Sequence, residues 1–381
     1  MLQAHPIPKA FWRHALTALA TGLLLLAQPA SADDTAAAAA VVPAAAAWTS
    51  ALDMMDAQGL NIHSVLISQG DRIVAERYRR GRDRGLYSLW SSNRDFGPDD
   101  LHDMRSVSKS VIALLYGILL ERGEVPALDT PVSALYPDHP DLAQPPKNAI
   151  LIRHLLTMTA GLAWDEPSPV HRPLHDDQTA LVWSRDLYAE VFGRDVQAPP
   201  GERFFYSGGL TSVLVDCIER STGRALTELL NEHLFQPLDI REWSWTKDLR
   251  GRPLAFAGLR LRPRDLLKIG RLVLAGGQWR GRQLVPAAWV AAATQAHVQA
   301  SADLGYGYQW WTRTITLKGR PFAVTMAIGN GGQRLYVLRD LDLVVAMTAG
   351  DYGTLEILLQ EDRLFAQLLA AAARSEAQAA R

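Results

Sequence analysis

The spacing of hydrophobic positions predicts strands near both ends of the chain and helices between them. Residues 63–78 form two runs rich in β-branched residues, and the turn-forming stretch 69–71 between them is typical of a hairpin. Hydrophobic residues alternate again late in the chain, most clearly from Phe322 to Ile328. Further strands are therefore expected at 306–317, 322–328, 334–338 and 343–348.

The middle of the chain, from about 106 to 250, has the spacing of helices separated by proline-bearing loops. A short helix is expected at about 48–58, a longer one from Ser106 to Gly123, and a last one over 354–373. Strands at both ends favour an α+β fold, in which an antiparallel sheet flanked by helices is interrupted by a mostly helical inserted subdomain. We expect the sheet-bearing part at about 48–105 and 255–381, and the helical part at about 106–254.

The first 32 residues have the pattern of an export signal. Basic residues precede an apolar run at 15–27, and the small residues Ala30 to Ala32 supply a cleavage site. A retained anchor is the less favoured alternative, because the run is shorter than the roughly 18 apolar residues of a membrane span. We expect cleavage near Ala32, export to the periplasm or the outside of the cell, and an alanine-rich tether over 33–47.

Composition narrows the classes of partner. The 381 residues carry a formal net charge of -1, so no basic field favours nucleic acid, and 48% of them are hydrophobic, enough for a large core. Cys217 is the single cysteine, which excludes an intramolecular disulfide, and its apolar surroundings predict a small core residue. A small or neutral substrate is left open, no stable membrane span is expected in the mature chain, and the oligomeric state is not determined.

The stretch RSVSKS, residues 105–110, places Ser106 and Lys109 at the start of a predicted helix. Residues three positions apart are neighbours on a helix, so the lysine amine can approach the serine hydroxyl. The helix N-terminus adds positive potential where an oxyanion would form. Such an arrangement can activate a serine nucleophile without histidine. The alternative is that Ser106 only caps the helix while Lys109 is solvated.

A second Ser-x-x-Lys pattern runs from Ser244 to Lys247. It lies in REWSWTKDLRGRP, which lacks helical spacing and continues into glycine and proline. Its serine would therefore have neither a rigid helical face nor a helix dipole beside it. We favour the first pattern as the catalytic one.

Two more stretches accompany the first pattern: PPGERFFYSGG contains Tyr206, and IGNGGQRLYV contains the glycine-rich segment 330–333. The stretches RSVSKS, HLLTMTAGLAWDE, PPGERFFYSGG, RPRDLLKIGRLVLAGGQWRGRQLVPAAWV, YGYQWW and GNGGQ follow one another along the chain. As a set and in this order, they resemble the serine β-lactamase and penicillin-binding-protein superfamily. The similarity runs from about residue 60 onward and is greatest to class C β-lactamases, related carboxylesterases and 6-aminohexanoate-dimer hydrolases. It implies a β-lactamase-like fold and a serine hydrolase that forms an acyl-enzyme.

The resemblance also implies a role for each matching residue. Ser106 would be the nucleophile, and Lys109 and Tyr206 its general base and acid. The backbone N–H groups of Ser106 and Gln333 would form the oxyanion hole. The residues that would bind substrate along a strand edge are Asn330, Gly331 and Gly332.

Departures from the family pattern bear on the substrate. Gly208 stands where class C enzymes have the asparagine of Tyr-x-Asn, and Asn330 replaces the cation of Lys-Thr-Gly. The site would then lose its hold on a substrate carboxylate, unless Arg334 supplies a replacement cation. We therefore expect a small ester or uncharged amide as substrate. The alternatives are β-lactamase or D-Ala-D-Ala peptidase activity, or a module of the same fold that binds peptidoglycan-like ligands without turnover.

Other candidate residues are given structural roles. His171 and His175 are four positions apart, but the prolines around them break the helix that would align them on a metal. Asp165 and Glu166 lie in a proline-rich loop and are expected to be solvated or structural. The sequence has no Walker loop, dinucleotide fingerprint or Gly-x-Ser-x-Gly elbow. No metal and no cofactor are expected.

Overall fold

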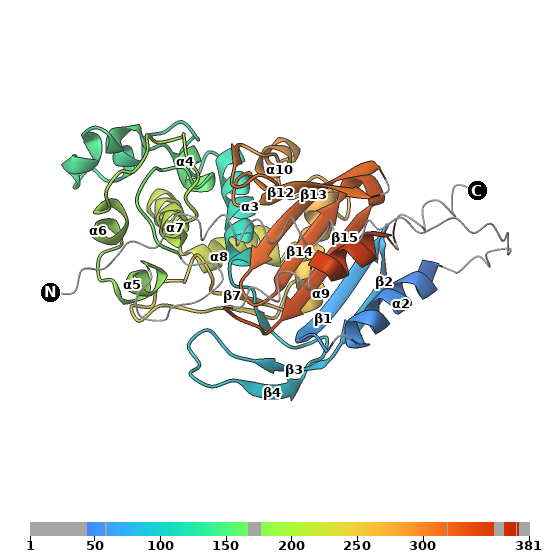
Figure 1. The fold of residues 1–381 in the computed structure, drawn as a ribbon. Helices are drawn as coiled ribbons and strands as arrows, with labels where there is room; N and C mark the ends of the chain where they lie inside the picture. The colour runs from blue at the N-terminus through green and yellow to red at the C-terminus, as the bar shows by residue number, and fades with distance from the viewer. Residues whose placement is uncertain are drawn as a thin grey trace.

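The main element of this computed structural model is an antiparallel sheet of eight strands (Figure 1), in the order β10-β11-β12-β13-β14-β15-β1-β2. The strands are β1 (Ile62–Gln69), β2 (Arg72–Tyr78), β10 (Val298–Gln299), β11 (Gly305–Tyr306), β12 (Trp311–Leu317), β13 (Arg320–Gly329), β14 (Gln333–Leu338) and β15 (Leu343–Ala349). Because β1 pairs with β15, strands from the two ends of the chain join one sheet. The structure describes residues 44–57, 59–166, 177–317, 319–353, 362–370 and 372.

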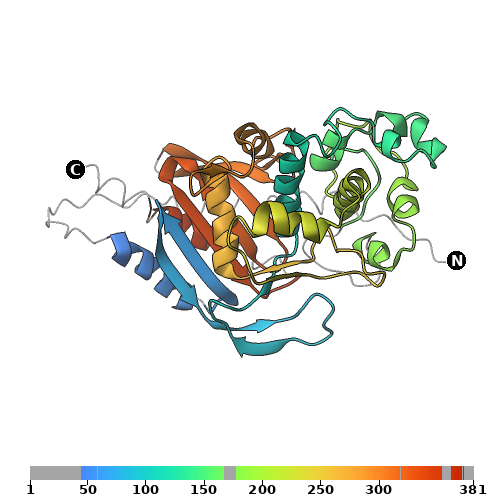
Figure 2. The same cartoon turned by 180° about the vertical axis from the view of Figure 1, so that it is seen from behind.

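Helices cover both faces of this sheet. Side chains of β15 alternate between two cores: Val344 and Ala346 belong to one, and Val345 and Met347 to the other. The first core is covered by α9 (Pro263–Leu274) and α3 (Val107–Glu121), with α10 (Ala287–Ala293) against α3. The second is covered by α2 (Ala44–Ala57) and by the helix formed by 362–370 (Figures 1 and 2).

The helical part of the chain lies at one side of the sheet (Figure 1). Helix α3 is the element between the two parts, and every residue from Val107 to Leu119 is buried, as expected for a helix with neighbours on all sides. The other helices are α4 (Ile152–Leu156), α5 (Asp177–Trp183), α6 (Leu187–Phe192), α7 (Gly208–Thr222) and α8 (Leu226–Leu230), the π-helix η4 (Asn231–Phe235), and the 3-10 turns η1 (Val132–Leu135), η2 (Pro140–Ala143), η3 (Lys147–Ala149) and η5 (Arg339–Leu341).

Three small sheets complete the described fold. A three-stranded sheet has the order β5-β7-β6, and its strand β5 comes shortly before α3 in the chain. Two further two-stranded sheets are the hairpins β3-β4 and β8-β9. Their strands are β3 (Arg80–Asp83), β4 (Ser92–Asp95), β5 (His102–Asp103), β6 (Trp243–Trp245), β7 (Leu259–Leu261), β8 (Gln278–Trp279) and β9 (Arg282–Gln283).

The predicted α+β fold is confirmed, with two differences in the elements. Helix α2 begins at Ala44, so the last four residues of the expected tether are helical, in keeping with the high helix propensity of alanine. The strand expected at 306–317 is divided into β11 and β12. The chain leaves the sheet there because Gln309, at φ 62°, turns its side-chain amide to donate to the carbonyls of Leu155 and Leu156.

The expected export signal, most of the tether and part of the C-terminal helix lie outside the described residues. Within the helix expected over 354–373, the described residues 362–370 and 372 are helical. No helix among the described residues is both long and apolar enough to cross a membrane.

Candidate active site

Ser106 is held where the small three-stranded sheet meets helix α3. The backbone N–H of Met104 donates to the Leu259 carbonyl of β7 at 2.8 Å. The Leu259 N–H donates in turn to the Ser108 hydroxyl at 3.1 Å, and that hydroxyl donates to the Arg105 carbonyl at 2.6 Å. The turn that carries Ser106 is therefore fixed to β7 from both sides.

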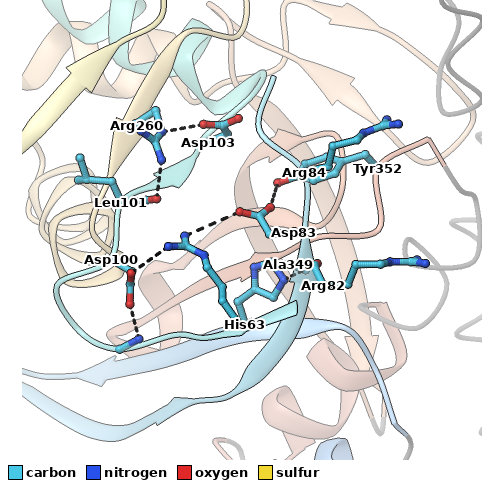
Figure 3. Close-up of polar contacts among 12 residues, drawn as sticks. His63, Arg82, Asp83, Arg84, Asp100, Leu101, Asp103, Arg260, Ala349 and Tyr352 are labelled. Atoms are coloured by element: carbon cyan, nitrogen blue, oxygen red, sulfur yellow. Dashed lines mark hydrogen bonds and ion pairs between the residues drawn. The ribbon is translucent and has the colours of Figure 1, made fainter. Parts of the chain in front are cut away.

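Arg105, the residue before the serine, adopts a left-handed conformation with φ 50°. Such a conformation is costly for a non-glycine residue, and the surrounding contacts must maintain it. Its guanidinium donates to the Arg84 carbonyl at 3.0 Å and lies 4.2 Å from the centre of the Tyr352 ring. It is also 3.6 Å from Asp103, which pairs with Arg260 at 2.8 Å (Figure 3).

Lys109 points to Ser106 from inside the protein. Its side chain is 1% exposed, and its Nζ donates to the Ser106 Oγ at 3.0 Å and to the Phe256 carbonyl at 3.2 Å. The Ser106 hydroxyl makes no capping hydrogen bond to α3, although the residue is the N-cap. The alternative of a capping serine beside a solvated lysine is therefore wrong.

Tyr206 comes to the same place from the start of α7. The chain there is fixed by the Phe205 N–H, which donates to the Met158 carbonyl at 2.8 Å, and by Ser207, which caps α7. The Tyr206 ring centre lies 4.7 Å from the Nζ of Lys109. Three segments far apart in the sequence thus meet around one buried amine.

An aromatic group surrounds the Tyr206 ring. The ring centre of Trp311 lies 5.5 Å away, and those of Phe204 and Tyr306 lie 6.3 Å away. Tyr306 is buried, and this burial raises the pKa of its phenol well above the usual value. Tyr306 and Trp311, the first and last residues of YGYQWW, therefore lie against Tyr206. Hydrophobic spacing alone did not predict this contact.

A carboxylate that the sequence left as structural also faces the lysine. Glu166 is 5% exposed, and its Oε1 is 3.7 Å from the Lys109 Nζ. The indole of Trp164 donates to its Oε2 at 3.0 Å, and the Gly208 N–H and the Gln178 amide also donate to the carboxylate. A signal was present in the sequence, because Glu166 is the last residue of HLLTMTAGLAWDE, one of the stretches that resemble the family.

The third motif forms the turn between β13 and β14. The Asn330 side chain accepts a hydrogen bond from the Gly353 N–H at 3.0 Å. Gly331, at φ 83°, faces the Tyr352 ring, which a Cβ would meet at 2.1 Å. A side chain at position 331 would therefore collide with Tyr352, so this turn requires glycine. Gln333 is completely buried, and its side-chain amide donates to the Ala349 carbonyl at 2.6 Å.

Arg334 does not present a cation to substrate. It is 2% exposed, and its Nη1 donates to the carbonyls of Gly329 at 2.8 Å and Gln333 at 2.9 Å. Its guanidinium therefore holds the end of β13 and the start of β14 together in the protein interior.

Comparisons with known proteins agree with this geometry. The beta-lactamase family model matches residues 49–364. The chain belongs to the beta-lactamase family. It is 27% identical over 299 residues to a 6-aminohexanoate-dimer hydrolase of Paenarthrobacter ureafaciens, which covers 74% of this chain and 70% of that protein. It is 34% identical over 173 residues to esterase EstB of Burkholderia gladioli, 43% of each chain.

A penicillin-binding-protein homologue from Caulobacter crescentus has a similar fold, with a TM-score of 0.65 at 18% identity over 86% of this chain and 97% of that one. The chain is also 26% identical over 153 residues to a D-alanyl-D-alanine-carboxypeptidase/endopeptidase of Escherichia coli, 39% of this chain and 37% of that protein. The relatives that match this chain thus include proteins named as an esterase, an amide hydrolase and a peptidase. The chain is a hydrolase of this family.

The remaining candidates lie apart from this serine or outside the described residues. Ser244 is on strand β6, as its lack of helical spacing predicts. Cys217 is buried in α7, and burial raises the pKa of its thiol to about 12, which makes it an inert core residue. His154 accepts a hydrogen bond from the Leu151 N–H at 3.2 Å, and burial lowers its pKa. His171 and His175 lie outside the described residues.

Proposed function

We propose that the protein is an exported serine hydrolase that cleaves small esters or amides through an acyl-enzyme on Ser106. The observation that carries the proposal is the buried Lys109, whose Nζ lies 3.0 Å from the Ser106 Oγ. A lysine is costly to bury, and a protein without this chemistry would have no use for one directed at a serine hydroxyl. The Tyr206 ring beside the amine supports the same conclusion.

The proposed reaction has two steps. In the first, the Ser106 oxygen attacks the substrate carbonyl carbon while its proton passes to the Lys109 and Tyr206 pair, and that proton then goes to the leaving group as the ester or amide bond breaks. In the second, water attacks the acyl-serine and gives one proton to the same pair, and that proton passes to the Ser106 oxygen as the acid product leaves. The backbone N–H groups of Ser106 and Gln333 are the proposed donors to the oxyanion, at the N-terminus of α3.

The charges around the site favour an uncharged substrate. Arg334 is turned to backbone carbonyls, and Asn330 carries no charge and accepts from Gly353. A substrate carboxylate would therefore have no cation from the third motif to pair with. This argument places simple esters and uncharged amides ahead of β-lactams and D-alanyl peptides.

Trapping of the acyl-enzyme tests the proposal. The protein is incubated with a fluorophosphonate probe, and the adduct is located by mass spectrometry. We expect the label on Ser106, no label in Ser106→Ala, and full labelling in Ser244→Ala, which removes the serine of the other Ser-x-x-Lys pattern. An adduct elsewhere, or none, would refute the enzyme proposal.

A substrate panel separates the proposal from its alternatives. Short-chain p-nitrophenyl esters, nitrocefin, D-alanyl peptides and linear aminohexanoate amides are compared at equal concentration. We expect the highest kcat/KM with an ester or a linear amide. Preference for nitrocefin or a D-alanyl peptide would favour the β-lactamase or peptidase alternative, and labelling of Ser106 without any turnover would favour a binding module.

Export is tested on the intact chain in a bacterial host. We expect the mature protein in the periplasm or medium, with an N-terminus near Asp33 by Edman or mass-spectrometric sequencing. A chain that keeps residues 1–32 and stays in the cytoplasm would contradict this part of the proposal.

A further inference from the structure

We infer that Glu166 is a positioning residue for the hydrolase reaction, that it fixes Lys109 as an ammonium directed at Ser106, and that Gly208 is the residue that makes room for it. This inference rests on the proposed function and adds a residue that holds Lys109 in place without touching the substrate.

The carboxylate is built into the site rather than left in a loop. At 5% exposure, Glu166 is removed from water, and its oxygens accept hydrogen bonds from Trp164, Gln178 and the Gly208 backbone. Both buried carboxylate oxygens therefore have hydrogen-bond donors, which hold the group in one orientation. Its Oε1 then lies 3.7 Å from the Lys109 Nζ, close enough for a strong interaction in a site shielded from solvent.

The glycine at 208 explains how the carboxylate reaches the lysine. A Cβ at this position would lie 3.1 Å from the Glu166 Oε2 and 3.0 Å from the Phe256 side chain, closer than nearly all such contacts in proteins. A larger residue therefore requires one of the two to shift by a few tenths of an ångström. Phe256 in turn supplies the carbonyl that accepts from Lys109 at 3.2 Å. The space at position 208, the Glu166 carboxylate and the Lys109 amine therefore depend on one another.

Lys109 and Glu166 are a buried pair of oppositely charged groups, and few other titratable groups lie beside them. Lys109 faces Glu166, Tyr206 and Ser106, and the buried Tyr306 is the further titratable group near both Tyr206 and Glu166. On the far side of Glu166, Trp164 stacks on the guanidinium of Arg194 at 5.5 Å.

The Arg194 guanidinium is paired with carboxylates other than Glu166. Arg194 pairs with Asp177 at 2.9 Å and also with Glu190. The carboxylate that lies nearest Lys109 among these groups is therefore Glu166. Removing it would leave a buried cation without its counter-charge, which is strongly unfavourable.

Glu166→Gln is the direct test, because glutamine keeps the shape and removes the charge. We expect kcat/KM for a neutral p-nitrophenyl ester to fall by about 10²-fold, the typical cost of displacing a catalytic group by roughly 1 Å. We also expect the alkaline limb of the kcat/KM profile to move to lower pH, because the negative charge that faces the Lys109 amine at 3.7 Å is removed. A carboxylate with a purely structural role would lower activity without moving this limb.

Asp165→Asn is the matched control. It neutralises the adjacent carboxylate in the same loop, and we expect its pH profile to match that of the unaltered protein. Thermal unfolding of both variants shows whether each chain is folded.

A pair of reciprocal variants tests the role of the space at 208. Gly208→Asn in the unaltered protein should reduce kcat/KM, because its side chain collides with Glu166 and Phe256. The same change in a Glu166→Ala background should increase kcat/KM several-fold, since the asparagine can then fill the vacated space and offer its amide oxygen to Lys109. This reversal of sign is expected only if the two positions share one space beside the lysine.

Failure of the inference is distinct from failure of the proposed function. An unchanged pH profile in Glu166→Gln, or a decrease in kcat/KM on adding Gly208→Asn to Glu166→Ala, would overturn the inference, while fluorophosphonate labelling of Ser106 would still support the hydrolase. Absence of that label in the unaltered protein would remove both.

Discussion

At the scale of single residues, the site depends on how the burial of Lys109 is compensated. An ammonium removed from water needs both hydrogen-bond acceptors and a counter-charge. Here the Ser106 hydroxyl, the Phe256 carbonyl and the Glu166 carboxylate supply them, and the Tyr206 ring lies on a further side. A lysine held in this way has its direction fixed before any substrate binds.

Replacing Tyr206 by phenylalanine removes only the phenol oxygen. We expect kcat to fall by about 10²–10⁴-fold, the range of a lost general acid or base, with the fold intact because the ring still packs against Trp311. Steady-state kinetics with a p-nitrophenyl ester and thermal unfolding measure the two effects. Tyr188→Phe, which removes a phenol from a surface contact with Asp141, is the control and should keep its activity. Near-full activity of Tyr206→Phe would show that another group is the base.

At the scale of elements, helix α3 links the two parts of the molecule, and its first turn is tied to strand β7. The link is the Ser108 hydroxyl, which accepts from the Leu259 N–H and donates to the Arg105 carbonyl. Arg105 is in a strained backbone conformation next to the nucleophile. The position of Ser106 therefore depends on a side chain two residues further along the helix.

Ser108→Ala should destabilise the protein by about 1–3 kcal/mol, because the buried Leu259 N–H loses its acceptor. Urea denaturation measures the free energy of unfolding. We also expect kcat/KM to decrease, since the turn that carries Ser106 loses its attachment to β7. Ser92→Ala, at an exposed position of β4, should change stability by less than about 0.5 kcal/mol. Equal stability of the two variants would mean that the Ser108 link is dispensable.

At the scale of the whole molecule, two buried histidines lie where the main sheet, the β3-β4 hairpin and the segment before Ser106 meet. His63 of β1 stacks on Phe96 at 3.9 Å, and Phe96 stacks on His102 of β5 at 4.8 Å. His63 also hydrogen-bonds the Arg82 carbonyl (Figure 3). Burial lowers the pKa of both histidines below the usual 6.5, and that of His102 well below it.

This burial predicts a loss of stability in mild acid. Well above pH 6.5 both histidines are neutral in the folded and the unfolded chain. As the pH falls through 6.5, the unfolded chain takes up protons that the folded chain excludes, so the free energy of unfolding should fall by up to about 1.4 kcal/mol per pH unit for each histidine. Urea denaturation between pH 8 and pH 5.5 measures this slope.

His102→Gln removes one of the two titrating groups. We expect a shallower decline of stability below pH 6.5 than in the unaltered chain, with pH 8 as the reference where neither histidine contributes to the slope. The same slope in both proteins would show that His102 does not contribute to the acid sensitivity.

The sequence by itself indicated the strands, the longer helices and the pair of Ser106 and Lys109, because their signals are local, while Tyr206 was indicated by its resemblance to a family motif. Periodicity fixes which side chains share a face, and a spacing of three on a helix places an amine beside a hydroxyl. Only the tertiary structure decided that Glu166 faces Lys109, that Tyr352 fills the space at Gly331, and that Arg334 turns inward. These contacts join segments far apart in the chain, and which distant side chain fills a given space depends on the packing of the whole fold, which no local pattern encodes.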